Sequence, residues 1–330
     1  MAYFAITPKN ASAPDDVIEI HRSDTHAAIE KVLVSKGIIE HPGLFNWVGR
    51  ITRQWPRVKA GEYKVSAAMS PLAIFSTLTS GISIIHPITV REGENMYEIG
   101  ADIEAKGLST PEEFVSLCRD RDFIVLMGFD PGMKSLEGFL FPDTYHFNKT
   151  MSVEDMVRQM VRHANQMWTP ADDARAARMG MTRFQIITLA SIVEKETGAP
   201  SDRPMISSVF HNRLRKRMKL QSDPTTIYGM WARFRGKIHK SDLSVANPFN
   251  TYVVAGLPEG PISNPGRESI TAALNPVQSD NLYFVSHNDG TTEFTKSLGD
   301  HNRAVQKFQL DPKARAGKSW RDLKKKKQSN

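Results

Sequence analysis

Apolar residues recur at helical spacing in several stretches of the chain, and each stretch is bounded by residues typical of helix ends. Near the N-terminus the pattern predicts a helix that begins after Thr25 and ends at Gly37, a strand over residues 61–66 and a second helix over 70–81. Together these elements predict a small α/β subdomain over residues 19–84.

The next elements predict a second subdomain over residues 85–132. A short strand over 88–93 precedes helices over 96–107 and from Ser109 to about Cys118. Four residues at the start of this segment resemble a LysM-type glycan-binding module: Val90, Gly93, Tyr97 and Ile99. The alternative interpretation is a purely structural α/β subdomain.

From residue 133 to 311, short periodic segments alternate with loops rich in Pro, Gly, Asn and Asp. Amphipathic or apolar helices are predicted over 153–168, 182–198 and 204–218. Two alternating runs around Asn288-Asp289-Gly290 predict a β-hairpin, followed by a last helix from Leu298 to about Leu310. The predicted fold class is α+β with several subdomains: the small N-terminal α/β and LysM-like units, then a larger mixed α/β domain.

The net charge of +7, from 43 basic and 36 acidic residues, is concentrated at the C-terminus. Residues 313–330 contain eight Lys or Arg and one acidic residue, so the rest of the chain is balanced at 35 bases and 35 acids. The sequence pI of about 9.4 therefore reflects a basic tail, predicted to be disordered over 312–330, and gives no support for a nucleic-acid groove.

The single cysteine and the N-terminal residues provide evidence about disulfide bonds and about a membrane anchor. Cys118 excludes an intrachain disulfide, and no apolar run reaches the 18 residues that a membrane helix needs. The apolar residues 1–7 (MAYFAIT) are either an unremarkable N-terminus or the end of a longer hydrophobic segment. With the Pro- and Asn-rich residues 8–18, they are interpreted as the stump of a membrane anchor and a linker.

The sequence lacks several common catalytic motifs, and their absence excludes some classes of enzyme. HExxH, GxSxG and GxxxxGK patterns are absent, and the sequence contains no metal-binding motif. Glu194 and Glu196 remain, at the two edges of the apolar sector of the helix over 182–198. Partial burial of either carboxyl group would raise its pKa and provide a general acid, whereas the alternative is a solvated rim.

Polar loops downstream of this helix favour carbohydrate as the ligand. Residues 220–229, 247–252 and 256–266 are rich in Pro, Gly, Asn and Thr, which hold fixed turns and present amides and hydroxyls. Aromatic residues within them could stack on pyranose rings or belong to the core: Tyr228, Phe249 and Tyr252.

Five ordered segments resemble the YceG-like family. They are LEGFLFPDTYHF (136–147), LASIVEKETG (189–198), SVFHNRLRKRMKLQSDPTTIYG (208–229), NPFNTYVVAGLPEGPISNPGRESITAALNP (247–276) and LYFVSHNDGTTEFTKSLGDHNRAV (282–305). The resemblance implies a catalytic domain over 133–311 that cleaves peptidoglycan between N-acetylmuramic acid and N-acetylglucosamine. It further implies a lytic transglycosylase that acts inside nascent strands, forms 1,6-anhydromuramyl ends without a cofactor and terminates strand elongation.

The resemblance also assigns roles to residues. The family's catalytic glutamate, the second Glu of EKET, falls on Glu196. Supporting or substrate-binding roles are expected for Glu137, Gln221, Asp223, Asn250, Tyr252 and Glu194. Turn capping is the rival role for Asp223, which precedes a proline. The sequence departs from the family at Glu259, where proline is usual, and the loop is expected to be looser there.

Location and partners are likewise expectations from the family. Its members are normally anchored in the cell inner membrane by one N-terminal helix, with the catalytic part facing the periplasm, and that helix is missing here. Peptidoglycan strands are the expected substrate, with peptidoglycan synthases and division or elongation proteins as partners and no nucleic acid. Two rival functions are a non-catalytic glycan-binding scaffold and a hydrolase that pairs Glu196 with Glu137 or Asp223.

Overall fold

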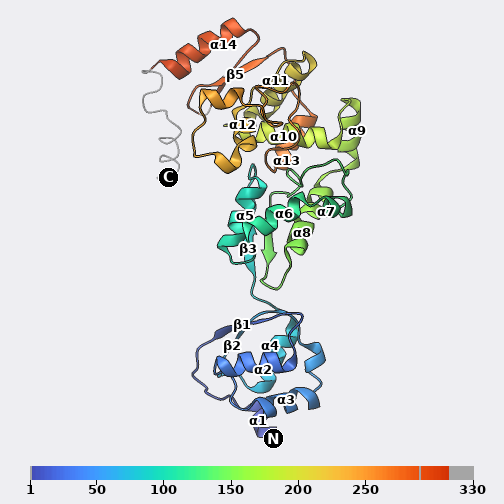
Figure 1. Cartoon of the computed structure of the whole chain (residues 1–330), viewed down its shortest axis with the longest axis vertical. Coiled ribbons are helices and arrows are strands. Elements are labelled where there is room, and N and C mark those ends of the chain that lie inside the picture. Colours follow the sequence, from blue (N-terminus) through green and yellow to red (C-terminus); the bar gives the residue numbers. More distant parts are fainter. Residues whose placement is uncertain (1, 290, 312–330) are drawn as a thin grey trace. The chain divides into compact units, whose positions relative to one another are not determined.

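The computed structural model describes residues 2–289 and 291–311, and the basic tail predicted over 312–330 lies outside the described residues (Figure 1). These residues form two compact units. Unit 1 comprises residues 2–89, 100–113 and 144–156, and unit 2 comprises 90–99, 114–143 and the described part of 157–311. The predicted domain boundaries after residues 84 and 132 remain predictions.

The first part of the chain contributes four helices, one helical turn and three strands. In chain order they are α1 (Ala2–Ile6), β1 (Asp16–Ile20), α2 (His26–Ser35), α3 (Pro42–Ile51), η1 (Trp55–Arg57), β2 (Gly61–Val65), α4 (Pro71–Ser80) and β3 (His86–Thr89). The next segment holds α5 (Met96–Ala105), α6 (Pro111–Arg119), α7 (Arg121–Leu126), β4 (Thr144–Phe147) and α8 (Val153–Met167).

The remainder of the described chain is mainly helical. It holds α9 (Pro170–Arg178), α10 (Arg183–Glu196), η2 (Pro200–Asp202), α11 (Arg203–Arg215), α12 (Asp223–Gly229), η3 (Trp231–Arg233), η4 (Lys240–Ser244) and α13 (Arg267–Leu274). The last elements are β5 (Tyr283–Ser286), β6 (Thr292–Thr295), α14 (Leu298–Val305) and the π-helical turn η5 (Gln306–Leu310). The mixed α/β class predicted from the sequence is confirmed.

Unit 1 is built around the antiparallel pair β1–β2, in which Ile18 faces Tyr63. Helices α2, α3 and α4 bury Leu33, Phe45 and Phe75 in one core beside this pair. Helix α4 begins where the Ser70 hydroxyl accepts a hydrogen bond from the backbone N–H of Ala73, and its C-terminal cap is a left-handed glycine, as the sequence predicts.

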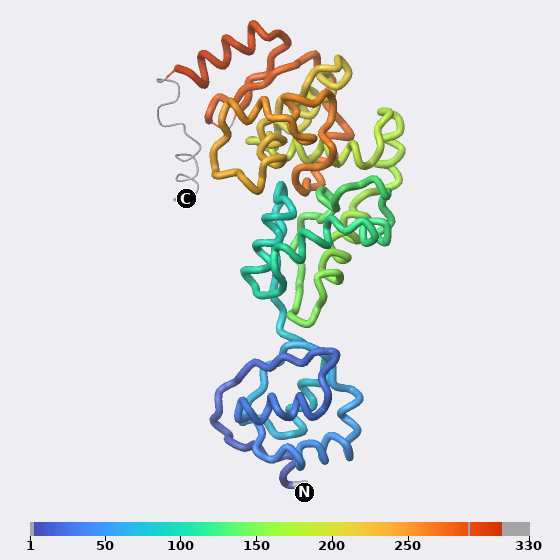
Figure 2. Tube along the Cα trace, viewed as in Figure 1, coloured from blue at the N-terminus to red at the C-terminus, as the bar shows by residue number. Residues whose placement is uncertain are grey.

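Unit 2 has α10 at its centre, packed against α11, α12 and α13 (Figure 1). Thr182 and Gln185 form a capping box at its N-terminus, and every residue from Ile186 to Val193 is buried. A helix that is buried on all sides belongs to the centre of a core, whereas the sequence pattern indicated a single apolar sector. The hairpin β5–β6 packs against α14 at the C-terminal end of the unit (Figure 2).

Three sequence-based boundaries need correction. The stretch interpreted as a linker ends in β1, which begins at Asp16 and gains its hydrogen bonds from β2, a partner that no local pattern reveals. The strand expected over 88–93 is β3, which ends at Thr89, because residues 91–94 form a turn with Gly93 at φ +81°. The last helix gives way to a π-helical turn after Val305.

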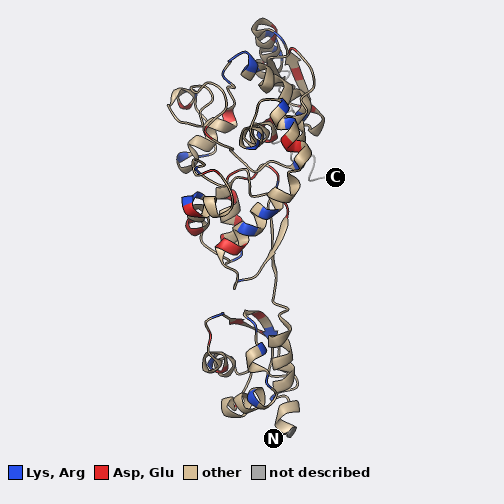
Figure 3. Cartoon of the chain, turned by 90° about the vertical axis from the view of Figure 1, so that its right-hand side faces the viewer, with Lys and Arg blue, Asp and Glu red and all other residues tan. Residues whose placement is uncertain are grey.

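The described residues carry charges of both signs and contain no helix that could span a membrane. Basic and acidic positions are interspersed along the ribbon of each unit (Figure 3). Within residues 2–289 and 291–311, no helix combines the length and hydropathy required to cross a bilayer.

Candidate active site

Glu196 is the last residue of α10, and the structure places its carboxyl group in a pocket of unit 2. The pocket has a volume of about 430 Å³. Helix α11 contributes Phe210 and Arg213 to its wall, and the hairpin contributes Tyr283 and Phe284. The site thus combines an acid, a cation and several aromatic rings, which suits the binding of a polar ligand with apolar ring faces.

Burial raises the pKa of Glu196 to about 7, and repulsion from Asp223 acts in the same direction. Two neighbours oppose this rise. The Ser222 hydroxyl donates to Oε1 of Glu196 at 2.6 Å, and the positive charge of Arg213 favours the carboxylate. The balance leaves a substantial protonated fraction at neutral pH, which is the form a general acid requires.

Three of the other sequence-predicted residues line the same pocket: Gln221, Asp223 and Tyr252. The Tyr252 hydroxyl donates to Oδ1 of Asp223 at 2.7 Å, and burial followed by this bond raises the pKa of Tyr252. Gln221 has a left-handed backbone with φ +53°, and its N–H donates to the carbonyl of Thr251 at 3.2 Å. This strained position holds the start of α12 against the loop that carries Tyr252.

Glu194 does not line the pocket, because its carboxylate is engaged elsewhere. Arg203 Nη2 lies 3.3 Å from its Oε1, and the backbone N–H of Gly266 donates to its Oε2 at 3.1 Å. Arg203 also pairs with Glu268 and Glu92. Of the two glutamates that the helical pattern left open, Glu196 therefore reaches the pocket and Glu194 fixes α10 to neighbouring segments.

Glu137 is fully buried and lies outside the pocket lining. Its Oε2 accepts from the N–H of Met96 at 3.0 Å, its Oε1 accepts from Asn264 Nδ2 at 2.9 Å, and the Tyr228 side chain donates to it. Burial raises its pKa to about 7, opposed by hydrogen bonds from the backbone N–H of Met96, the Tyr228 side chain and the backbone N–H of Gly138. Its contacts give it an internal anchoring position that joins the start of α5 to α12.

The amide of Asn250 is also used internally. Its oxygen accepts from the Thr226 hydroxyl at 3.0 Å and from the N–H of Tyr252 at 3.0 Å. Its nitrogen donates to three backbone carbonyls, the shortest bond being 2.8 Å to Val245. Asn250 thus shapes the loop that presents Tyr252. The other two aromatic candidates, Tyr228 and Phe249, pack in or against the core.

The sequence assigned no role in the site to three residues that line the pocket, Arg213, Tyr283 and His301, or to Ser222, which contacts Glu196. Arg213 lies in the last turn of α11, where the helix dipole ordinarily accounts for a basic residue. Its spacing of three from Phe210 and seven from Ile206 on α11 places it on the apolar stripe, and this was the available signal. His301 stacks on Tyr283, and its Nδ1 is buried without a hydrogen-bond partner among the described residues.

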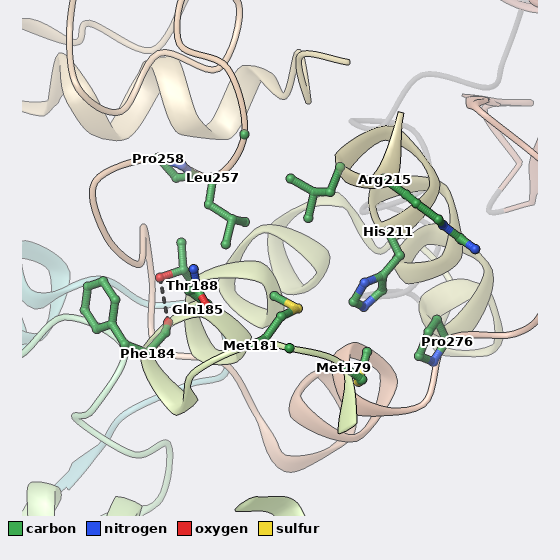
Figure 4. A pocket seen from close by; sticks show the side chains of 13 residues that line it. Met179, Met181, Phe184, Gln185, Thr188, His211, Arg215, Leu257, Pro258 and Pro276 are labelled. Atoms are coloured by element: carbon green, nitrogen blue, oxygen red, sulfur yellow. Dashed lines mark hydrogen bonds between the residues drawn. The ribbon is translucent and has the colours of Figure 1, made fainter. Parts of the chain in front are cut away.

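A second, larger cavity of about 860 Å³ lies on the other face of α11 (Figure 4). His211 and Arg215 from α11 and Phe184 and Thr188 from α10 line it. Its lining contains no carboxylate, and the described residues hold no cluster of three or more metal-ligating side chains. Of the two cavities beside α11, the smaller one therefore holds the candidate acid, Glu196.

The departure from the family pattern at Glu259 has a local consequence. The backbone N–H of Glu259 donates to the carbonyl of Pro248 at 3.1 Å, a bond that proline could not make. The side chain is exposed. The loop expected to be looser is therefore tied down at this position.

The comparisons with known proteins agree on one family. The model of the YceG-like family matches residues 18–307. The endolytic murein transglycosylase of Bacillus subtilis (strain 168) is 32% identical over 305 residues, which cover 88% of this chain and 84% of that protein. The endolytic murein transglycosylase of Streptococcus pneumoniae (strain D39) is 27% identical over 311 residues, and the chain spans about half its length, 55%.

A solved structure shares the fold. The crystal structure of a YceG-like protein from Listeria monocytogenes superposes with a TM-score of 0.61 at 30% sequence identity. The match covers 89% of this chain and 100% of that one.

Proposed function

Since this chain belongs to the YceG-like family, we propose that it is a peptidoglycan lytic transglycosylase that cuts glycan strands internally. The bond is the β-1,4 linkage between N-acetylmuramic acid and N-acetylglucosamine, and the product carries a 1,6-anhydromuramyl end. The observation that carries the proposal is the position of the Glu196 carboxyl group in a pocket lined by polar and aromatic side chains, where burial raises its pKa to about 7.

In the first step, protonated Glu196 donates its proton to the glycosidic oxygen as the bond from that oxygen to C1 of the muramyl sugar breaks. Positive charge develops on C1 and its ring oxygen. The Glu196 carboxylate that forms is stabilised by the Ser222 hydroxyl and by the positive charge of Arg213. General acid catalysis of this kind contributes about 10²- to 10⁴-fold in rate.

In the second step, the C6 hydroxyl of the same muramyl sugar attacks C1, and its proton passes to the Glu196 carboxylate. The carboxyl group returns to its starting form, and the sugar closes into the 1,6-anhydro ring. Since water does not take part, one carboxyl group serves both steps and the paired carboxylates of a hydrolase are not required. Exact positioning of the C6 hydroxyl supplies the remaining acceleration.

A hydrolase of the same bond is the second candidate, because Asp223 lines the pocket beside Glu196. In that reaction Asp223 would activate a water molecule or attack C1 itself. Glu137 is a poor partner for either role, since its carboxyl group is fully buried and already accepts several hydrogen bonds within the chain.

Further parts of the proposal rest on the family. The segment over 85–132 acts as a LysM-like glycan-binding element ahead of the catalytic domain over 133–311, and the Tyr97 ring, stacked on Trp231 at 5.7 Å, is its candidate contact. A glycan-binding scaffold without catalysis is the corresponding alternative. The protein acts at the inner membrane, on its periplasmic face, near peptidoglycan synthases and division or elongation proteins, where cleavage terminates strand elongation.

Mass spectrometry of the products tests the proposal. Purified protein is incubated with uncrosslinked glycan strands, and we expect muramyl ends in the anhydro form. Ends that are heavier by one water molecule would replace the transglycosylase with the hydrolase. Sacculus binding with no new ends of either kind, unchanged by Glu196→Gln, would favour the scaffold.

A further inference from the structure

Arg213 has an unusual environment for a buried arginine. Its side chain is 7% exposed, on the face of α11 that lines the Glu196 pocket. Nε donates to the carbonyl of Leu282 at 2.7 Å, and Nη1 donates to the carbonyl of Leu220 at 2.8 Å and more weakly to that of Lys219 at 3.2 Å. Backbone carbonyls on two sides thus fix the guanidinium group in one orientation.

The second terminal nitrogen of Arg213, Nη2, takes no part in these bonds to backbone carbonyls. It makes no hydrogen bond to any described residue, and it is not among the buried unpartnered atoms of the described chain. Nε and Nη1 are occupied by backbone carbonyls, and Nη1 also lies 3.4 Å from Oε1 of Gln221, so Nη2 is the nitrogen of this pocket-lining side chain that has N–H groups to spare. Two N–H donors are therefore available there to a ligand.

The charge of Arg213 also lacks a fixed counter-ion. No carboxylate oxygen of the described residues lies within 4.0 Å of its nitrogens, whereas Arg203 on the same helix pairs with three glutamates. The Tyr283 ring lies 5.0 Å from the guanidinium carbon and adds a cation–π contact. A buried cation without a paired anion is costly, so a conformationally fixed one in a pocket indicates a binding role.

The proposed substrate offers a partner for this group. The two sugars of the glycan repeat differ only in the 3-O-lactyl group of N-acetylmuramic acid, which ends in a carboxyl carbon. In peptide-free strands that group is a carboxylate, and in peptide-bearing strands its carbonyl oxygen belongs to an amide. Both present an oxygen acceptor, and a guanidinium donor binds either.

We propose that Arg213 is a substrate-binding residue whose Nη2 donates hydrogen bonds to a lactyl carboxyl oxygen of the muramyl sugar. This inference rests on the proposed function. Arg213 then selects muramyl sugars for the position beside Glu196. Chito-oligosaccharides, which contain N-acetylglucosamine alone, have the same backbone and lack the acceptor.

The test measures binding in the full chain with Glu196→Gln, which prevents turnover. Three probes of equal length are titrated calorimetrically: a peptide-free GlcNAc–MurNAc tetrasaccharide, the same compound with stem peptides, and chitotetraose. We expect the muramyl probes to bind at least tenfold more tightly than chitotetraose. Adding Arg213→Met should abolish that difference, and Arg213→Lys should reduce it at least threefold. A larger loss for the peptide-free probe would identify the carboxylate as the acceptor, and equal losses would identify the carbonyl oxygen.

Arg183→Met is the matched control, because Arg183 is also desolvated, donates to a backbone carbonyl and lies over aromatic rings, away from this pocket. It should leave the discrimination between probes unchanged. If Arg213→Met does not fold, Arg213→Lys carries the test. Undiminished discrimination in the folded Arg213 variants, or an equal loss of affinity for chitotetraose, would overturn the inference. Failure of the proposed function would instead appear as missing anhydro ends with the wild-type chain.

Discussion

The Ser222 hydroxyl and the Glu196 carboxyl group are joined by a 2.6 Å hydrogen bond that links the residue before α12 to the last residue of α10. Since a donated hydrogen bond favours the carboxylate, it works against burial, which favours the neutral acid. The protonation of Glu196 therefore depends on the balance between its burial and a hydrogen bond from another segment of the chain.

The rate of glycan cleavage should depend on pH through Glu196. With a pKa of about 7, the protonated acid predominates below neutrality and falls about tenfold per pH unit well above it. We expect kcat/KM to level off below about pH 6 and to decline above about pH 7. Initial rates measured from pH 5 to 9 check this, and a level profile from pH 6 to 9 would contradict an acid with this pKa.

Two substitutions beside Glu196 should move that decline in opposite directions. Ser222→Ala removes a bond that lowers the pKa of Glu196, so the decline should move to higher pH. Asp223→Asn removes a negative charge that raises it, so the decline should move to lower pH, while the amide oxygen still accepts from Tyr252. Movement of both profiles in one direction would show that another group controls the rate.

Glu196 and Glu194 should differ sharply in their effect on activity. Glu196→Gln removes the proton donor and is expected to lower the rate of anhydro-end formation by about 10²- to 10⁴-fold. Glu194→Gln changes the same residue type two positions earlier on α10, and should weaken the link to Arg203 and lower Tm while leaving the rate within a few-fold. Equal activity losses in two folded variants would refute this division of roles.

The stability of the folded protein should also depend on the protonation state of the Glu196 carboxyl group. Because the pKa of Glu196 is about 7 in the folded protein and 4.5 in its ordinary environment, its contribution to stability is full below pH 4.5 and lost as the pH rises to about 7. The Tm of the wild type minus that of Glu196→Gln should therefore fall between pH 4.5 and 7. Glu137 titrates in the same range in both proteins and cancels in this difference. A constant difference across this range would exclude the raised pKa.

Gly138 should tolerate no side chain. Its φ is +86°, and a Cβ there would lie 2.6 Å from Cγ of Pro261 and 2.8 Å from Cγ2 of Ile187. Gly128 has φ +87° with no atom within 4 Å of the same position. Chemical unfolding of Gly128→Ala should show the left-handed backbone cost alone, roughly 1–2 kcal/mol. Gly138→Ala should cost about 1–3 kcal/mol more from overpacking, and equal losses would contradict the close contact.

The parts of this structure that the sequence predicts are those with local causes. Helix α10 carries its own capping residues, Thr182 and Gln185, within one turn, and the hairpin β5–β6 carries its own turn residues. The position of Glu137 has no such cause. Its partners Met96 and Asn264 lie 41 and 127 residues away, so only the folded chain reveals that its carboxyl group is enclosed.

The residues of the candidate site likewise include some that the sequence predicts and others that only the folded chain reveals. Helical geometry alone left Glu194 and Glu196 equivalent, because the choice depends on Arg203 and Ser222, which belong to other segments. The supporting residues Gln221, Asp223 and Tyr252 reach the pocket, whereas Asn250 acts on the loop behind them. Arg213 had a local signal, since it interrupts an apolar stripe, but a base near a helix C-terminus has a more common explanation.

Helix α11 separates two cavities, with Phe210 and Arg213 toward one and His211 and Arg215 toward the other. Most of its length from Ile206 to Arg213 is also buried. In a saturation-mutagenesis experiment scored on cell growth, this helix should therefore appear as a nearly unbroken run of intolerant positions, where a surface helix would show a tolerant position at every turn. Freedom to vary should return only at its exposed end, beginning with Arg215.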